Sequence, residues 1–385
     1  MDLNVLKNEI MEWRHYLHRH PEWALEEKIT SDFIAGKLEE MGLEVHRNIG
    51  KTGIVAVLKC GDGTEAVGLR ADMDAICLEE LGDVSYKSEN PGKMHACGHD
   101  GHSATLLGAA KLLSERRDFN GTVYFIFQPG EEPGIGADAM MEDGLFDRFP
   151  MNEIYGLHNM PQLPQGSINT CRGGMMASED DFTIRIKGRG GHSSLSNRVC
   201  DPLVTAAEII LALQTIVARD VNPLEPAVVS CTNILTNGTR NAIPDIVEIS
   251  GDTRSTTPAV QELLEKRMRT ICTGVCNANQ MSFELTYTHD FAPTYNNERC
   301  VDTALKAAEK VVGKDKVDGN CQPLMGSEDF GKMMSVVPGC YVLIGGKREG
   351  EDYIPVHNPY FDYNDEVLLT GAQYFAELVR IRLPK

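Results

Sequence analysis

The stretch V-Y-F-I-F-Q-P-G-E-E-P-G occupies residues 123–134 and joins an apolar run to a turn that carries two adjacent carboxylates. The run from Val123 to Phe127 is short and ends at proline and glycine, which predicts a strand. Adjacent side chains diverge, so Glu131 and Glu132 can have different roles, one as a metal ligand and the other beside a water molecule. Metal-assisted hydrolysis needs both roles. A solvated acidic turn is the simpler interpretation of this stretch taken alone.

Helices and strands alternate on both sides of this stretch. The expected strands are 54–58, 67–69, 123–127, 154–157 and 341–344, and the expected helices are 3–20, 30–41, 104–113, 137–141, 303–312 and 367–379. This alternation predicts an α/β fold, a mixed α/β/α sandwich whose sheet is covered on both faces. Such sheets place their sites beyond the carboxyl ends of the strands. The strand 154–157 is expected to end at His158, and most of the other histidines of interest also follow predicted strands.

The pattern changes between residues 178 and 289. The expected order is strand 182–186, helix 202–218, strands 228–234 and 246–250, helix 258–277 and strand 283–287. This β-α-β-β-α-β order predicts a ferredoxin-like α+β domain. We therefore expect two domains, a discontinuous catalytic domain over 1–177 and 290–385 and an inserted domain over 178–289.

The composition excludes several classes of partner. The chain has 385 residues, with 56 acidic against 37 basic side chains and a formal net charge of -19. Such a charge repels nucleic acid and anionic membranes, and an anionic substrate would need local capture by metal ions. Solubility alone also explains the acidity. No apolar run is long enough for a membrane span or a signal core, and eleven scattered cysteines suit a reducing cytoplasm.

Residues 95–102, H-A-C-G-H-D-G-H, form the densest group of metal-ligating side chains. Cys97 and His99 are two residues apart, so in an extended loop both point the same way and can reach one ion. The neighbouring side chains of His95, Asp100 and His102 are candidates to orient those ligands from behind. The alternative is a helix-capping loop with incidental histidines.

Two further histidines lie far from this motif in the chain. His158 and His357, taken singly, are better explained as satisfied structural residues. Together with Cys97, His99 and Glu132, they complete a set of nitrogen, oxygen and sulfur ligands. This mixed set favours zinc, manganese, cobalt or nickel over magnesium and calcium, which prefer oxygen alone.

An ordered series of motifs spans the chain: H-R-H-P-E at 18–22, G-L-R-A-D-M-D-A at 68–75, H-A-C-G-H-D-G-H, Q-P-G-E-E, G-L-H-N-M-P at 156–161, G-R-G-G-H-S at 188–193, N-A-I-P-D at 241–245, G-S-E-D-F at 326–330 and V-H-N-P at 356–359. This series resembles the amidohydrolase branch of the aminoacylase and carboxypeptidase metallopeptidase family. That branch includes hippurate hydrolase, N-acyl-amino-acid hydrolases and auxin-conjugate hydrolases.

The resemblance implies a role for individual residues. The family holds two divalent metal ions per subunit with residues that match Cys97, His99, Glu132, His158 and His357. In the family, the glutamate before the metal-binding one is the general base, and it matches Glu131. A histidine of the family polarises the substrate carbonyl, often across a dimer, and it matches His192. The same resemblance implies substrate binding by Asn241, Ser327 and Glu328. It also implies that Asp72 and Asp74 support the site from behind. Asp100 is expected to do the same because of its position in the motif H-A-C-G-H-D-G-H.

The chain departs from the family pattern beside His192. Relatives have a proline-containing turn after Gly-His-Ser, whereas residues 194–200 read S-L-S-N-R-V-C. Substrate choice therefore transfers less safely than the metal site does. The resemblance implies hydrolysis of the amide bond of small N-acyl amino acids by a homodimer, with a tetramer as the alternative. Two alternatives remain open. One is a dipeptidase or carboxypeptidase on the same scaffold, and the other is a catalytically silent metal-binding homologue.

Overall fold

The computed structural model describes residues 2–385 and divides the chain into two compact units. The larger unit comprises Met1–Met175, Tyr295–Gln322 and Asp329–Lys385, and the smaller comprises Met176–Thr294 and Pro323–Glu328. The main borders lie within a few residues of the expected ones. Segment 323–328 differs, because it was expected in the catalytic domain. It joins the smaller unit because the backbone N–H of Ala177 donates to the carbonyl oxygens of Leu324 and Gly326, each at 3.0 Å.

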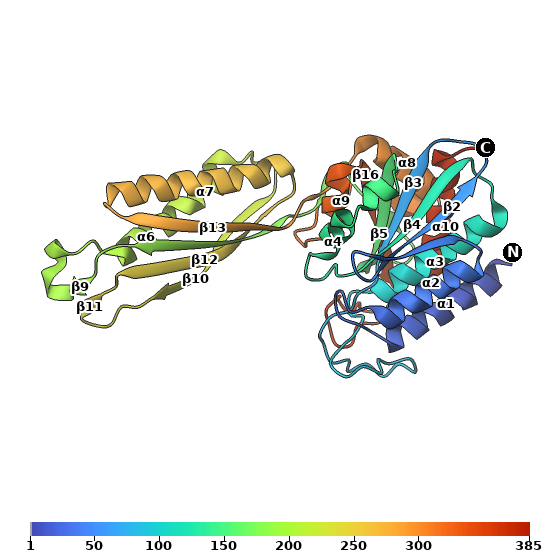
Figure 1. The fold of residues 1–385 in the computed structure, drawn as a ribbon, viewed down its shortest axis with the longest axis horizontal. Coiled ribbons are helices and arrows are strands. Elements are labelled where there is room, and N and C mark those ends of the chain that lie inside the picture. The colour runs from blue at the N-terminus through green and yellow to red at the C-terminus, as the bar shows by residue number, and fades with distance from the viewer. Residues whose placement is uncertain (1) are drawn as a thin grey trace. The chain divides into compact units, whose positions relative to one another are not determined.

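An eight-stranded mixed sheet forms the centre of the larger unit, in the order β1-β2-β4-β3-β5-β16-β6-β15 (Figure 1). Its strands are β1 (Glu44–Ile49), β2 (Gly53–Cys60), β3 (Ala66–Asp72), β4 (Gly121–Gln128), β5 (Glu153–Pro164), β6 (Ile168–Asn169), β15 (Val317–Asp318) and β16 (Gly339–Lys347). The central strands β4, β3, β5 and β16 run parallel, whereas β1 and β2 are antiparallel to their neighbours. The carboxyl ends of the four parallel strands therefore meet at one edge of the sheet.

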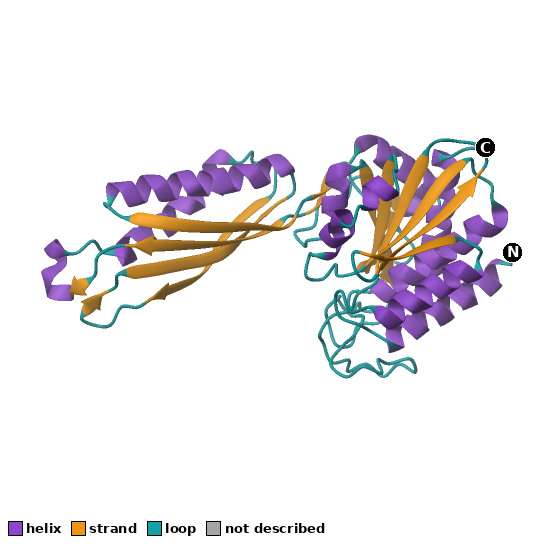
Figure 2. Cartoon of the chain, viewed as in Figure 1, coloured by secondary structure: helices purple, strands orange, loops and turns teal. Residues whose placement is uncertain are grey.

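Helices cover both faces of this sheet (Figure 2). Its helices are α1 (Leu3–Arg19), α2 (Lys28–Glu40), α3 (His99–Arg116), α4 (Gly136–Glu142), α5 (Leu145–Arg148), α8 (Glu298–Val312), α9 (Phe330–Val336) and α10 (Leu368–Arg382). Side chains of α1, α2, α3, α8 and α10 share one core with alternate strand residues such as Tyr155 and Leu157. On the opposite face, Phe330 of α9 packs against Tyr341 of β16, with ring centroids 5.4 Å apart. The expected α/β/α sandwich is confirmed.

Two element boundaries that bear on the site differ from expectation. The strand expected to end at His158 continues to Pro164 as β5, because β16 pairs with it as far as that residue. Strand β3 pairs with β5 only up to Gly156, so the other side of β5 is open from Leu157 onward. The helix expected from Ala104 begins at His99 instead, after Gly98 with a φ of 99°. Its first turn consists of polar residues, which give no apolar periodicity to detect.

The smaller unit has the predicted ferredoxin-like fold. Its main elements are β8 (Glu179–Lys187), α6 (Pro202–Thr215), β10 (Ala227–Thr236), β12 (Ile246–Ser255), α7 (Pro258–Ala278) and β13 (Ser282–Phe291). The antiparallel sheet has the order β10-β12-β8-β13, and both helices pack into one core with it. The short strands β9 (Gly191–His192) and β11 (Ala242–Ile243) form a separate pair, as do β7 (Gly173–Met176) and β14 (Thr294–Asn296).

One helical stretch, Pro202–Asp220, is long and apolar enough to cross a membrane by length and composition. Core helices of soluble proteins pass the same test. Here Ala206, Ile209 and Leu213 of this stretch lie in the core of the smaller unit. The expectation that no segment spans a membrane stays a prediction.

Candidate active site

The structure brings the five expected metal ligands together in the larger unit. Cys97 belongs to two groups of potential ligand atoms, one with His99 and His158 and the other with Glu132 and His357. Within each group the ligand atoms lie no more than 4.8 Å from one another. The five residues come from the loop before α3, the first residue of α3, the turn after β4, the middle of β5 and the loop after β16. The parallel strands and the open side of β5 thus gather side chains that are far apart in the sequence.

Asp74 orients two of these ligands at once. The imidazole Nδ1 of His99 lies 3.0 Å from the Asp74 carbonyl oxygen and 3.2 Å from Oδ1. The other carboxylate oxygen, Oδ2, accepts a hydrogen bond from the backbone N–H of Glu132 at 3.1 Å. In the same way, Nδ1 of His158 lies 2.6 Å from the carbonyl oxygen of Asn159. These contacts turn Nε2 of both histidines towards the cluster, as metal-binding histidines require.

The polar atoms at the centre of the cluster fit a metal ion. The buried atoms His99 Nε2 and Glu132 Oε1 have no hydrogen-bond partner among residues 2–385 and lie 3.9 Å apart. Buried polar atoms without partners are rare and costly in folded proteins. A divalent cation would satisfy both atoms, and the surrounding thiol, imidazole and carboxylate groups suit a transition metal.

Burial and neighbouring charges shift the pKa values of these ligands in different directions. Burial, aided by the charge of Glu132, raises the pKa of the Cys97 thiol to about 12. Burial, aided by His102, lowers the pKa of His158 to about 3. Burial also lowers the pKa of His99, but the charges of Asp72 and Cys97 outweigh it and raise that pKa well above its ordinary value. A metal ion held by Cys97 would therefore displace a proton from its thiol.

A second layer of buried contacts surrounds the ligands. The carboxylate of Asp72 lies 2.6 Å from Nδ1 of His102 and accepts a hydrogen bond from Arg70 at 2.9 Å. On its other side, His102 Nε2 accepts a hydrogen bond from the backbone N–H of Asn159 at 3.0 Å. A Cβ on Gly98 would lie 2.4 Å from the Asn159 side chain, so only glycine fits there. No role was expected for Asn159, although it follows His158 in the motif at 156–161.

Glu131 lies beside the ligands and is itself buried. Its Oε2 is 3.8 Å from His99 Nε2. The turn that carries Glu131 is held by Glu27, whose carboxylate accepts hydrogen bonds from Gly130 N at 3.0 Å and Thr52 Oγ1 at 2.6 Å. Burial raises the pKa of Glu27 to about 7. The sequence reasoning missed Glu27, because a glutamate at the start of a charged helix resembles a surface residue.

Asp100 does not contact the metal ligands through its carboxylate, in contrast to the expectation. Its Oδ2 accepts a hydrogen bond from Arg14 Nε at 2.8 Å and lies 2.8 Å from His18 Nδ1. Burial raises the pKa of Asp100, but the charges of Arg14 and His18 outweigh it and hold that pKa well below its usual range. Asp100 therefore ties the first turn of α3 to α1, and supports His99 only through the backbone of that turn.

The smaller unit contains the other expected site residues. His192 and Asn241 are neighbours in space, because His192 pairs with Ala242 and the N–H of Ser193 donates to the Asn241 carbonyl oxygen at 3.1 Å. Both residues are exposed. The imidazole Nδ1 of His192 accepts a hydrogen bond from Ser194 N at 3.2 Å. In the neutral ring the proton then lies on Nε2, which becomes a donor.

Ser327 and Glu328 also lie in the smaller unit, in segment 323–328. Ser327 Oγ donates to Glu179 at 2.8 Å and accepts from Arg254 at 2.9 Å, and Glu328 is buried. Ser327 thus holds two charged side chains within its own unit.

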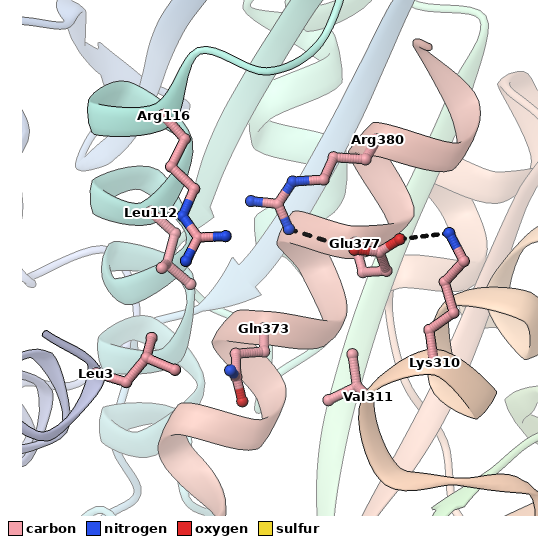
Figure 3. Close-up of a pocket in the computed structure, with 8 residues that line it drawn as sticks. All are labelled: Leu3, Leu112, Arg116, Lys310, Val311, Gln373, Glu377 and Arg380. Atoms are coloured by element: carbon pink, nitrogen blue, oxygen red, sulfur yellow. Dashed lines mark hydrogen bonds and ion pairs between the residues drawn. The ribbon is translucent and has the colours of Figure 1, made fainter. Parts of the chain in front are cut away.

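A surface cavity of about 230 Å³ in the larger unit lies elsewhere (Figure 3). Its lining residues come from α1, α3, α8 and α10 and are Leu3, Leu112, Arg116, Lys310, Val311, Gln373, Glu377 and Arg380. Glu377 pairs with Lys310 at 2.7 Å and with Arg380 at 3.3 Å. None of the expected site residues lines this cavity, so we assign it no part in the site.

Comparison with known proteins agrees with this arrangement. A hippurate hydrolase from Campylobacter jejuni is 40% identical over 97% of this chain and 96% of its own length. An N-acetylcysteine deacetylase from Bacillus subtilis is 35% identical over 97% of both chains. The crystal structure of the Bacillus subtilis YXEP protein, described as a dinuclear metal-binding peptidase from the M20 family, is 32% identical, covers 99% of both chains and superposes with a TM-score of 0.86.

The model of peptidase family M20/M25/M40 matches residues 68–381, which include every expected metal ligand as well as Glu131 and His192. The resemblance stated from the motifs is confirmed. The chain belongs to peptidase family M20/M25/M40.

Proposed function

We propose that this protein hydrolyses the amide bond of small N-acyl amino acids and releases a carboxylate and a free amino acid. The cluster of five proposed metal ligands, with the additional carboxylate of Glu131 beside it, carries the proposal. Relatives named hippurate hydrolase, N-acetylcysteine deacetylase and IAA-amino acid hydrolase support this substrate class.

Two divalent metal ions would be held by Cys97, His99, Glu132, His158 and His357, with zinc, manganese, cobalt and nickel as the candidates. Bound there, the ions would acidify a water molecule and polarise the substrate carbonyl. Elemental analysis of the protein purified without added metal would identify them and give their stoichiometry.

Glu131 would take the proton from the attacking water on its carboxylate and pass it to the leaving nitrogen. The Nε2–H of His192 would donate to the carbonyl oxygen as negative charge develops on it, and Ser194 N holds the ring in the required tautomer. Asn241, adjacent to His192, would bind the substrate carboxylate or carbonyl. Ser327 and Glu328 would line the substrate pocket.

A dipeptidase or carboxypeptidase is the second candidate. Relatives from Saccharolobus solfataricus named thermostable carboxypeptidase are 34% identical over 96% of this chain, which favours this alternative over unrelated chemistry. The metal cluster would be the same, and only recognition of the substrate would differ.

A substrate panel separates the candidates. The metal-loaded protein would be assayed against benzoyl-, acetyl- and aminoacyl-amino acids, with release of the free amino acid as the readout. We expect turnover of benzoyl or acetyl substrates. Turnover of aminoacyl substrates alone would favour a peptidase, and metal binding without any turnover would favour a catalytically silent homologue.

We also propose that the protein is a homodimer in the cytoplasm. Edge strand β10 exposes Ile234 and Leu235, and helix α6 exposes Leu211 with 72% of its surface accessible. Exposed apolar side chains beside an open strand edge are typical of protein interfaces. Free thiols on all eleven cysteines support a reducing compartment. Light scattering on the wild type and Leu211→Glu would show whether this surface forms the dimer.

A further inference from the structure

Two cysteines outside the metal cluster lie on neighbouring segments of the larger unit. Cys171 follows β6, and Cys321 follows β15, which pairs in parallel with β6. The pairing continues beyond both strands: Thr170 N donates to the Asp318 carbonyl oxygen at 2.8 Å, and Cys321 N donates to the Thr170 carbonyl oxygen at 3.1 Å. The backbone thus holds the two cysteines side by side, which a disulfide requires.

Their side chains meet at one atom. The thiol of Cys171 donates to Met175 Sδ at 3.5 Å, and the thiol of Cys321 donates to the same sulfur atom at 4.0 Å. Cys171 is buried, whereas Cys321 is partly exposed. Solvent and small oxidants therefore have access to the pair from the side of Cys321.

Cys171 also differs chemically from the other cysteines. The neighbouring Cys321 thiol lowers the pKa of Cys171, although burial and the charge of Asp318 oppose that shift. In seven other cysteines the pKa is shifted in the opposite direction, above its ordinary value. These are Cys97, Cys231, Cys272, Cys276, Cys300, Cys321 and Cys340. A thiol that is more readily ionised, next to a second thiol, is the arrangement found at sites that oxidise reversibly.

We propose that Cys171 and Cys321 form a reversible disulfide when the protein meets hydrogen peroxide. The Cys171 thiolate attacks one peroxide oxygen, which breaks the O–O bond, forms a sulfenic acid and releases hydroxide. The Cys321 sulfur then attacks the sulfenic sulfur, the S–O bond breaks, and hydroxide leaves. The protons of the two thiols convert both hydroxides to water, so one peroxide is reduced while two thiols are oxidised.

The position of the pair gives the disulfide a structural effect. Cys171 lies just before the border at Met175, and Cys321 lies just before the border at Gln322. Both segments lead from the larger unit into the smaller one. The disulfide therefore ties together two of the connections between the units, without involving the metal ligands.

Peptide mapping tests the proposal. The metal-loaded protein is treated with a modest excess of hydrogen peroxide, alkylated, and digested with trypsin without reduction. Each of the two cysteines is the sole cysteine of its tryptic peptide, 149–172 for Cys171 and 317–332 for Cys321. We expect a linked pair of these peptides, lighter by two hydrogens than their sum, that dithiothreitol separates.

Two kinds of variant make the test specific. Cys171→Ser and Cys321→Ser should each abolish the linked species, whereas Cys77→Ser removes an exposed cysteine and should leave it unchanged. Oxidation of the exposed Cys77 while Cys171 and Cys321 remain fully alkylated would overturn the proposal. Linkage of either cysteine to a different partner would also overturn it.

Discussion

The metal cluster and the loop region around His192 and Asn241 are built in opposite ways. In the cluster, His99 is completely buried and is fixed by Asp74, which also holds the backbone of Glu132. His192 is exposed and is held by Ser194, two residues further along the chain. The ligand cluster therefore depends on tertiary packing, whereas the orientation of the His192 ring depends on a local turn. Substitutions in the two regions should therefore differ in what they disturb.

The largest effect is expected at Glu131. Glu131→Gln should lower kcat by about a thousandfold, since the amide cannot accept the proton from water. Bound metal measured by elemental analysis should stay unchanged, because Glu131 is the neighbour of the proposed ligand and not the ligand itself. Glu132→Gln is the matched control and should lose metal. Near-normal turnover of Glu131→Gln would refute its role as the base.

His192→Ala should lower kcat by about a hundredfold, because one donor to the developing oxyanion is lost. The melting temperature and the metal content should not change, since the side chain is exposed and makes only local contacts. The surface variant His46→Ala serves as the control for histidine removal. A drop in metal content or stability in His192→Ala would erase the distinction between the two regions.

Cys97→Ala should weaken metal binding by about tenfold or more. Because burial raises the pKa of the Cys97 thiol to about 12, binding must release its proton at neutral pH. Wild-type affinity should therefore rise more steeply with pH than that of the variant, with a difference of about tenfold per pH unit. Competition titrations with a chelator at pH 6 and pH 8 would measure both slopes, and parallel slopes would exclude Cys97 as a ligand. Cys272→Ala, in the core of the smaller unit, should bind metal normally.

An effect on stability, and not on turnover or metal binding, is expected at Glu27. In the metal-free protein its pKa is raised from 4.5 to about 7, so the folded state keeps a proton that the unfolded state has lost between these values. Stability therefore falls as pH rises from 4.5 to 7, by about 3 kcal/mol in total. Glu27→Gln should flatten this dependence in thermal melts after chelation. Identical pH profiles for wild type and variant would contradict the raised pKa.

The sequence predicted most of the fold and named the five residues that the structure brings together in the cluster. Apolar patterns predicted the strands and helices, whereas the five residues of the cluster came from the mixed set of potential ligands and from the resemblance to the family. The contacts of Asp100 with Arg14 and His18 and of Glu27 with Gly130 were not predictable, since they join segments whose distance apart depends on packing. The continuation of β5 past His158 was not predicted, because the apolar run ends at Leu157.

Asp74 has a consequence beyond the placement of any one ligand. Its two carboxylate oxygens face different segments, the ring of His99 and the amide of Glu132. A shift of this one side chain would move a nitrogen ligand and an oxygen ligand together. Because one cation could satisfy both His99 Nε2 and Glu132 Oε1, a change at Asp74 would alter two contacts of the same ion at once.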